Sequence, residues 1–236
     1  MDTIISSSLR APLHFDLFLG FQFKVLGIGK ISGDGEGSCR LVVCNTQIMR
    51  AGKHYVTFDR VRGSISPVAN IGIMRPLIGW KSSDDNLPSD YNFDKADRKD
   101  RKISNKCYFN PMPVFQTDNK ALLSGRSERW GPSSIHACFG WGSLWRCSDW
   151  NITSKPCDPK GVPNTHFSQP EPDYGLLLDL DKGALSLIRN GTESYLIKGG
   201  LSGEYVWAVS FCNRAEITIK RAQLPDTRQS SSEDGG

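Results

Sequence analysis

The sequence lacks the long apolar runs and the helical periodicity on which several classes of protein depend. No apolar run approaches the roughly 18 residues that a membrane-spanning helix needs. No segment sustains the three- and four-residue apolar spacing of an amphipathic helix, and no internal repeat is visible. These absences argue against a membrane-spanning protein, a helical bundle and a repeat protein.

Cysteine is present without the spacings of the common metal-binding or redox motifs. The seven cysteines leave one unpaired in any complete disulfide scheme, and no two form a Cys-x-x-Cys pair. The first residues also lack the basic and apolar regions of a secretory signal peptide. We therefore expect a reducing compartment, which places the protein in the cytoplasm or the nucleus.

Charge of one sign does not dominate any long stretch. The chain has 29 basic and 25 acidic residues and a net charge of +4, and the two signs are interspersed. A nucleic-acid-binding surface usually has a basic stripe or patch. We expect neither a nucleic acid nor a membrane as the partner.

The strongest pattern lies between residues 174 and 191. Leucines there alternate with other residues in two runs, as expected for two strands that each bury one face. The first run contains Leu176, Leu178 and Leu180, and the second contains Leu185 and Leu187. The sequence Asp-Lys-Gly between the runs and Asn190-Gly191 after them are turn sequences, the second typical of a type I′ turn. This stretch therefore predicts an antiparallel hairpin.

Similar runs recur along the chain and predict an all-β fold. About eleven short strands are separated by turn residues, a pattern typical of a two-sheet antiparallel β-sandwich. Residues 15–25 read as a half-buried strand or hairpin. Further strands are expected at 39–44, 54–61, 68–74, 135–140, 193–197, 205–212 and 215–220. We expect a core that includes Leu178, Leu180, Leu187, Trp207, Val209 and Ile217.

Composition divides the rest of the chain into one domain with long loops and disordered ends. Residues 82–129 are polar and contain a run of alternating charge, which cannot anchor a core. We expect residues 1–12 to be flexible, 13–222 to form a single domain with an insertion at about 82–129, and 223–236 to be disordered.

The C-terminal half of the chain resembles a SPRY domain. Its residues 175–191, 200–203 and 207–210 follow the family's order of turn, apolar alternation, Asn-Gly and Ala-Val-Ser. Residues 52–58 and 70–73 are similar to two earlier strands, so the resemblance covers about residues 48–222. It implies a bent β-sandwich of the concanavalin-like jelly-roll type that binds proteins. The family's PRY segment has no recognisable counterpart, and whether residues 13–25 take its place is left open.

The resemblance also implies where a partner binds. In the family, partner-contacting residues lie in the loops that follow two strands, here those ending near residues 73 and 210. Some peptide-binding members have Trp-Gly where this chain has Cys-Asn, so their peptide preference does not transfer. Carried over by position, the partner-binding residues, expected on one exposed surface, are Arg75, Pro76 and Trp80, then Cys212, Asn213 and Arg214.

We therefore predict a non-catalytic, monomeric interaction module without a cofactor, whose loops at one end of the sandwich contact a protein or peptide. A role as a substrate-recognition adaptor would need another chain.

Two alternatives use other residues. A metal-assisted hydrolase could use His136 with Cys138, Cys147 and Cys157, and Asp149 or Asp158 as an acid, but these spacings do not match zinc motifs and we expect no zinc. A carbohydrate-binding sandwich could use Trp141, Trp145 and Trp150 as stacking platforms.

Overall fold

The computed structural model describes residues 12–19, 23–33, 39–61, 68–79, 127–141, 144–149, 154–157, 174–212 and 216–224. These residues form fourteen strands and one short 3-10 turn, η3 (Glu128–Trp130). They include no helix long and apolar enough to cross a membrane. The strands are β1 (Leu17–Leu19), β2 (Phe23–Gly27), β3 (Lys30–Gly33), β4 (Cys39–Val43), β5 (Lys53–Val61), β6 (Val68–Met74), β7 (Ile135–Trp141), β8 (Leu144–Asp149), β9 (Ser154–Cys157), β10 (Tyr174–Asp179), β11 (Ala184–Arg189), β12 (Glu193–Lys198), β13 (Val206–Cys212) and β14 (Glu216–Arg221).

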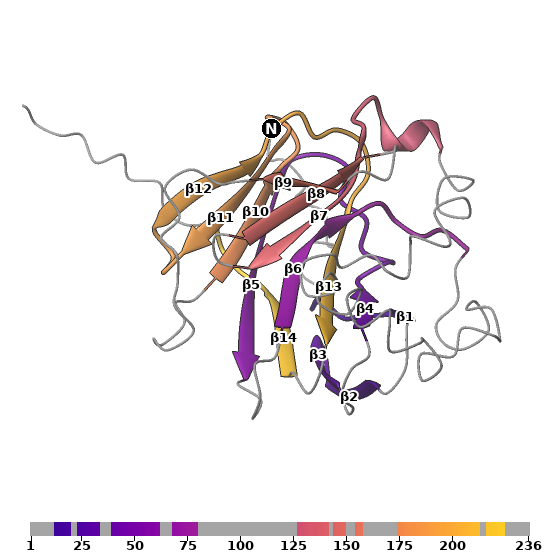
Figure 1. Cartoon of the computed structure of the whole chain (residues 1–236), viewed down its shortest axis with the longest axis vertical. Coiled ribbons are helices and arrows are strands. Elements are labelled where there is room, and N and C mark those ends of the chain that lie inside the picture. The colour runs from indigo at the N-terminus through magenta and orange to yellow at the C-terminus, as the bar shows by residue number, and fades with distance from the viewer. Residues whose placement is uncertain are drawn as a thin grey trace, which may run out of the picture.

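The strands form two seven-stranded sheets that pack face to face as a β-sandwich (Figure 1). The first sheet has the order β1-β4-β13-β6-β7-β8-β9, and the second has the order β12-β11-β10-β5-β14-β3-β2. Every strand pair is antiparallel, as in β4 with β13 and β5 with β10. The predicted all-β, two-sheet antiparallel sandwich is confirmed.

The hairpin predicted at residues 174–191 is formed by β10 and β11. Leu176 pairs with Leu187 and Leu178 pairs with Leu185, so the leucines of both strands share one face. The backbone N–H of Lys182 donates to Asp179 Oδ1 over 3.0 Å within the connecting turn. In the next turn, Asn190 and Gly191 have φ of 51° and 71°, the two positive values that a type I′ turn needs.

The main core lies between the two sheets and contains most of the residues predicted to be buried. Leu178, Leu187 and Val209 are completely buried, and Ile217 and Trp207 are nearly so. Leu180 is only half-buried, because it lies in the turn after β10 ends. The prediction of the core is therefore confirmed except at Leu180.

The alternating segment at residues 15–25 is not a single strand or hairpin. β1 belongs to the first sheet, where Leu17 pairs with Val43, whereas β2 belongs to the second sheet and pairs with β3. The side chains of Leu17 and Leu19 are buried, while that of Val25 is 61% exposed. Apolar residues alternate in the sequence from residue 15 to residue 25, although β1 ends at Leu19 and β2 begins at Phe23. Periodicity alone cannot tell which sheet a strand joins.

Three strands were not predicted. β3 pairs with β2 and β14 in the glycine-rich segment after residue 27. β8 and β9 extend the first sheet beyond β7. Trp145 on β8 is a buried core residue. The cluster of tryptophans and polar residues hid the alternation there.

The insertion and the termini largely fall outside the described residues. The segment 82–126, the first eleven residues and the tail after residue 224 are not described, so the domain boundaries stay a prediction. The last part of the expected insertion is ordered, because η3 spans Glu128–Trp130 and buries Trp130.

Replacing Leu178 with alanine should lower the free energy of unfolding by about 2–5 kcal/mol, because it removes a fully buried side chain and leaves a cavity. Urea denaturation measures this change. The matched control is Leu196→Ala, at a leucine that is 59% exposed, which should change stability by less than about 0.5 kcal/mol. Equal effects of the two variants would contradict the placement of Leu178.

Candidate functional site

Arg75 follows the end of β6 and is completely buried, with 0% of its surface exposed. Its Nη1 donates to the carbonyl oxygens of Ser202 and Glu204 over 2.8 and 2.9 Å, and its Nη2 donates to that of Ser133 over 3.2 Å. Its guanidinium lies 4.0 Å from the centre of the Tyr205 ring, within cation–π range. The expectation that Arg75 lies on an exposed loop surface is therefore wrong.

The carbonyl groups explain why a charged side chain is buried here. They belong to two segments, one before β7 and one before β13, that would otherwise leave backbone acceptors without donors inside the protein. A guanidinium offers five N–H donors in one plane, so a single side chain can bind both segments. This role could not be predicted from the sequence, because Arg75-Pro76 also fits an exposed turn.

The two loop segments expected to form one partner-binding surface follow strands that end at opposite ends of the first sheet. β6 and β13 are antiparallel neighbours in which Val206 pairs with Met74 and Cys212 pairs with Val68. The residues after Met74 and those after Cys212 therefore leave from ends that are about 20 Å apart, at roughly 3.3 Å per residue. The expectation of a shared surface is wrong, since the C-terminal ends of antiparallel neighbours point in opposite directions.

The remaining residues of that expected surface divide into buried and undescribed ones. Pro76 is buried. Trp80, Asn213 and Arg214 lie outside the described residues, as does the side chain of Cys212, so a contact of these four with a partner stays a prediction.

Three residues of the hydrolase alternative lie inside the protein and not at an open surface. His136, Cys138 and Cys147 are buried. Within the described ranges, no three His, Cys, Asp or Glu side chains are grouped so that they could hold a metal ion. The side chain of Cys157 and all of Asp158 lie outside those ranges.

His136 is held neutral by its surroundings. Burial lowers the pKa of its imidazole to about 4, and the positive charge of Arg75 acts in the same direction. The carbonyl and the carboxylate of Asp149 act in the opposite direction and only partly offset the burial. At neutral pH the ring is therefore an uncharged part of the packing beside Arg75.

The carbohydrate-binding alternative is not supported by Trp145, the one of its three tryptophans whose side chain the structure describes. Trp145 is 1% exposed and packs in the core, so it cannot present a flat face to a sugar. The side chain of Trp141 and all of Trp150 lie outside the described residues.

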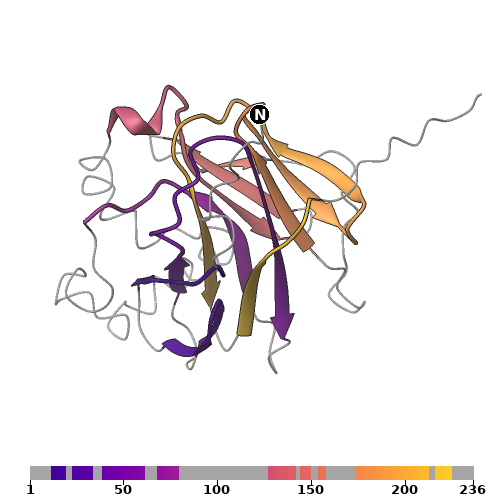
Figure 2. The ribbon, with the colours of Figure 1, turned by 180° about the vertical axis from the view of Figure 1, so that it is seen from behind.

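A hollow of about 610 Å³ opens between the edges of the two sheets. β1 is the edge strand of the first sheet and β2 is the edge strand of the second. Figure 2 shows these indigo strands together at one corner of the molecule. The hollow is lined by Pro12, His14, Phe15, Phe18, Val25, Gly27, Ile28, Lys30 and Ile31.

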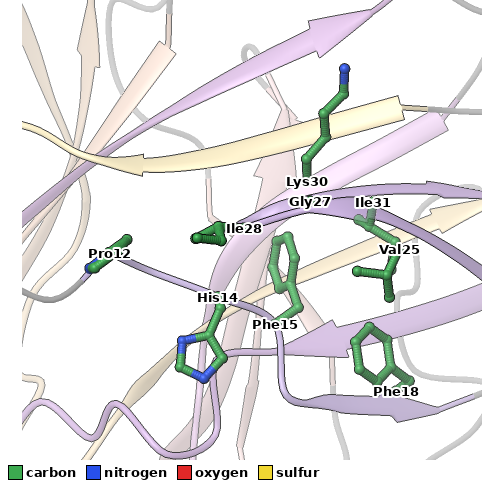
Figure 3. A pocket seen from close by; sticks show the side chains of 9 residues that line it. All are labelled: Pro12, His14, Phe15, Phe18, Val25, Gly27, Ile28, Lys30 and Ile31. Carbon is green, nitrogen blue, oxygen red and sulfur yellow. The ribbon is translucent and has the colours of Figure 1, made fainter.

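The lining is largely apolar. Figure 3 shows the rings of Phe15 and Phe18 next to Val25, with Ile28 further along the same hollow. Phe15 and Ile31 belong to the main core, so the hollow reaches its edge. Val25, Leu26 and Ile28 are 61%, 39% and 71% exposed.

The β2–β3 turn holds these aliphatic side chains in place. Gly29 has a φ of 66°, and a Cβ there would lie 2.6 Å from the carbonyl oxygen of Ile219 and 2.8 Å from that of Leu13. The N–H of Ile219 donates to the carbonyl of Gly29 over 2.9 Å. Only glycine fits this close approach, and it keeps the preceding Ile28 at the surface.

The side of the hollow that contains His14, Phe15 and Phe18 is held in place by Asp16. Its carboxylate accepts from the backbone N–H groups of Asn45 and Thr46 over 2.5 and 2.8 Å, and from the Thr46 hydroxyl. The N–H of Asp16 donates to the carbonyl of Val43 over 3.0 Å. Sequence reasoning missed this site because it placed both walls on one strand, although the Gly-Ile-Gly at residues 27–29 signals a turn.

Replacing Arg75 with methionine should lower the free energy of unfolding by on the order of 3 kcal/mol. Each buried carbonyl group that loses its hydrogen-bond donor costs about 1–3 kcal/mol, and hydration of these groups offsets part of the total. Chemical denaturation measures the loss. The control is Lys220→Met, which removes an exposed ion pair with Asp59 and should cost less than about 1 kcal/mol. A loss below 1 kcal/mol for the Arg75 variant would rule out the bridging role.

Stability should fall as the pH drops from 7 to 5. The folded pKa of His136 is about 4 and the unfolded value is 6.5, so in this window the unfolded state binds a proton that the folded state does not. Over this window, His136 should lower the free energy of unfolding by about 2 kcal/mol, since one unit of pKa difference corresponds to about 1.36 kcal/mol. His136→Gln should reduce the pH-dependent loss by that amount in urea titrations. An NMR titration of the His136 ring showing a pKa near 6.5 would contradict the assignment.

No family model and no curated protein matches the sequence. The solved structures similar to it include the SPRY domain of human HERC1, with a TM-score of 0.47 and 14% identity, covering 86% of this chain and 96% of that one. The TRIM65 PSpry domain has a TM-score of 0.41 and 14% identity and covers 89% and 86%. The carbohydrate-binding module CBM66 from Bacillus subtilis has a TM-score of 0.39 and 6% identity and covers 88% and 94%. The chain is a two-sheet antiparallel β-sandwich, similar in fold to these SPRY domains.

Proposed function

We propose that the protein is a non-catalytic interaction module that binds an extended, apolar segment of a partner protein at the hollow between β1 and the β2–β3 hairpin. The observation that carries this proposal is the grouping of Val25, Leu26 and Ile28, all exposed, beside an apolar hollow. Large aliphatic side chains gathered at a surface typically mark a binding site.

The grouping is specific to this hairpin. Six large hydrophobic residues are exposed in the described part of the chain, and three of them fall within four consecutive positions. The other three, Ile78, Leu196 and Leu224, are far apart in the sequence. Isolated exposed hydrophobics need no explanation, whereas a group of them beside a hollow does.

The size and position of the hollow favour an extended segment. About 610 Å³ falls within the range of about 300–1,000 Å³ that is usual for binding pockets, and it is enough for one or two large side chains. β2 pairs with β3 alone among the described strands, so its other edge can accept an added strand. A bound segment would thus pair with β2 and insert an apolar side chain beside Phe15 and Phe18.

Charge further defines the partner. His14 and Lys30 at the hollow each lie beside an acid, Asp16 and Glu216, at 4.0 and 2.5 Å. Lys24 on β2 is exposed, and it has no ion pair within the described residues. A carboxylate in the partner segment would complement Lys24.

Catalysis is not part of the proposal. The titratable groups that line the hollow are His14 and Lys30, and both are engaged by neighbouring side chains: His14 Nδ1 lies 3.2 Å from Gln47 Nε2, and Lys30 pairs with Glu216. The sequence motifs that resemble SPRY domains imply the same class of function. We further propose that the module acts as a monomer inside the cell, as expected from the sequence.

Panning the immobilised protein against a library of random linear peptides tests the proposal. Enriched peptides should carry a large apolar residue near Asp or Glu. For a synthetic enriched peptide, Ile28→Asp should weaken binding about tenfold or more, as loss of an interface anchor does. Fluorescence polarisation measures the affinity.

The matched control is Leu196→Asp, which places the same charge at another exposed aliphatic position and should leave the affinity unchanged. Both variants should keep the melting temperature of the parent, because both positions are largely exposed. A peptide that binds both variants equally well, or a library that yields no peptide, would disprove the proposed site.

A further inference from the structure

Two cysteines face each other directly across neighbouring strands of the first sheet. Cys138 on β7 pairs in register with Cys147 on β8. Both are buried in the core between the sheets, with 0% and 3% of their surface exposed, and both are reduced. Neither has a part in the proposed binding site.

The backbone geometry of this pair suits a disulfide. Directly opposite residues of antiparallel strands have Cα atoms about 4.5 or 5.5 Å apart, depending on the hydrogen-bonding position. A disulfide spans Cα separations of about 4.4–6.8 Å. Opposite residues also share a face of the sheet, and both of these side chains belong to the same core cluster. The two strands therefore need little movement to bring the sulfur atoms into bonding distance.

We propose that Cys138 and Cys147 form a dithiol site that closes reversibly to a disulfide by exchange with a small-molecule disulfide such as oxidised glutathione. One thiolate attacks the glutathione disulfide, forms a mixed disulfide and releases one glutathione thiol. The second thiolate attacks the bound sulfur and releases the other glutathione. The pair loses two protons and two electrons, and one oxidised glutathione becomes two reduced molecules.

The sheet provides a route to this buried pair. β8 is separated from the edge of the first sheet only by β9, a strand of four residues. Edge elements with few contacts open locally more readily than central strands. Opening of this edge would expose Cys147, so the exchange should be slower than that of a surface thiol.

Cys44 is a matched buried thiol that is not paired in register with another cysteine in the described strands. It is completely buried, and its backbone N–H donates to the carbonyl of Trp207 over 2.9 Å. Burial raises the pKa of the Cys44 thiol, and the nearby Asp16 carboxylate adds to this effect. The described strand pairings place no cysteine opposite Cys44, so Cys44 should form no intramolecular disulfide.

The test protein should carry serine at Cys39 and Cys212, because the register of β4 and β13 also places these two opposite each other. This full-length protein is reduced, freed of reductant and incubated with oxidised glutathione, and acid then stops the exchange. The intact mass should be lower by two hydrogen atoms. After the remaining thiols are blocked with N-ethylmaleimide in denaturant, non-reducing peptide mapping should show Cys138 joined to Cys147. Dithiothreitol should reverse the change, and circular dichroism should remain that of the folded protein.

Two variants in the same background complete the test. Cys147→Ser should abolish the intramolecular disulfide, and Cys44→Ser should retain it. The proposal is overturned if Cys138 and Cys147 remain separately alkylated in the folded protein, or if they join only after urea has unfolded the chain. A disulfide that survives Cys147→Ser by using Cys157 would overturn the pairing as well.

Discussion

The burial of the Arg75 guanidinium is the interaction on which the organisation of the loops depends. A charged group inside a protein is costly unless its hydrogen bonds are satisfied. Here the carbonyl groups of Ser133, Ser202 and Glu204 supply acceptors, and the Tyr205 ring lies against the cation. The segments before β7 and β13 are thereby fastened to the end of β6. A residue that the sequence suggested for binding a partner instead holds the molecule together.

The hairpin of β10 and β11 could be predicted from the sequence because its determinants are local. Leucine alternation fixes which face is buried, and Asp181-Lys182-Gly183 supplies the connecting turn, in which Gly183 has a φ of 64°, so register follows without knowledge of the rest of the chain. Trp207 and Val209 were predictable for the same reason. Arg75 was not, because its partners are 58 to 129 residues away in the sequence.

The candidate site could not be predicted because it depends on how strands are shared between sheets. The apolar pattern of residues 15–25 is continuous, yet β1 and β2 join different sheets, and the hollow exists only because of that separation. The prediction of one partner-binding surface, which the resemblance implied, was wrong for a related reason. β6 and β13 are antiparallel neighbours, so the loops that follow them leave from opposite ends of the sheet.

The edge strand β2 combines features that favour a short bound segment over uncontrolled pairing. Exposed edge strands tend to aggregate, and proteins limit this with lysine and with bulges. β2 has both, since Lys24 lies on it and its pairing with β3 shifts register between Val25 and Gly27. A long flat strand from another sheet would meet the bulge and the charge, whereas a short acidic segment would complement Lys24. At the proposed site, the same edge would therefore select a short partner segment and resist self-association.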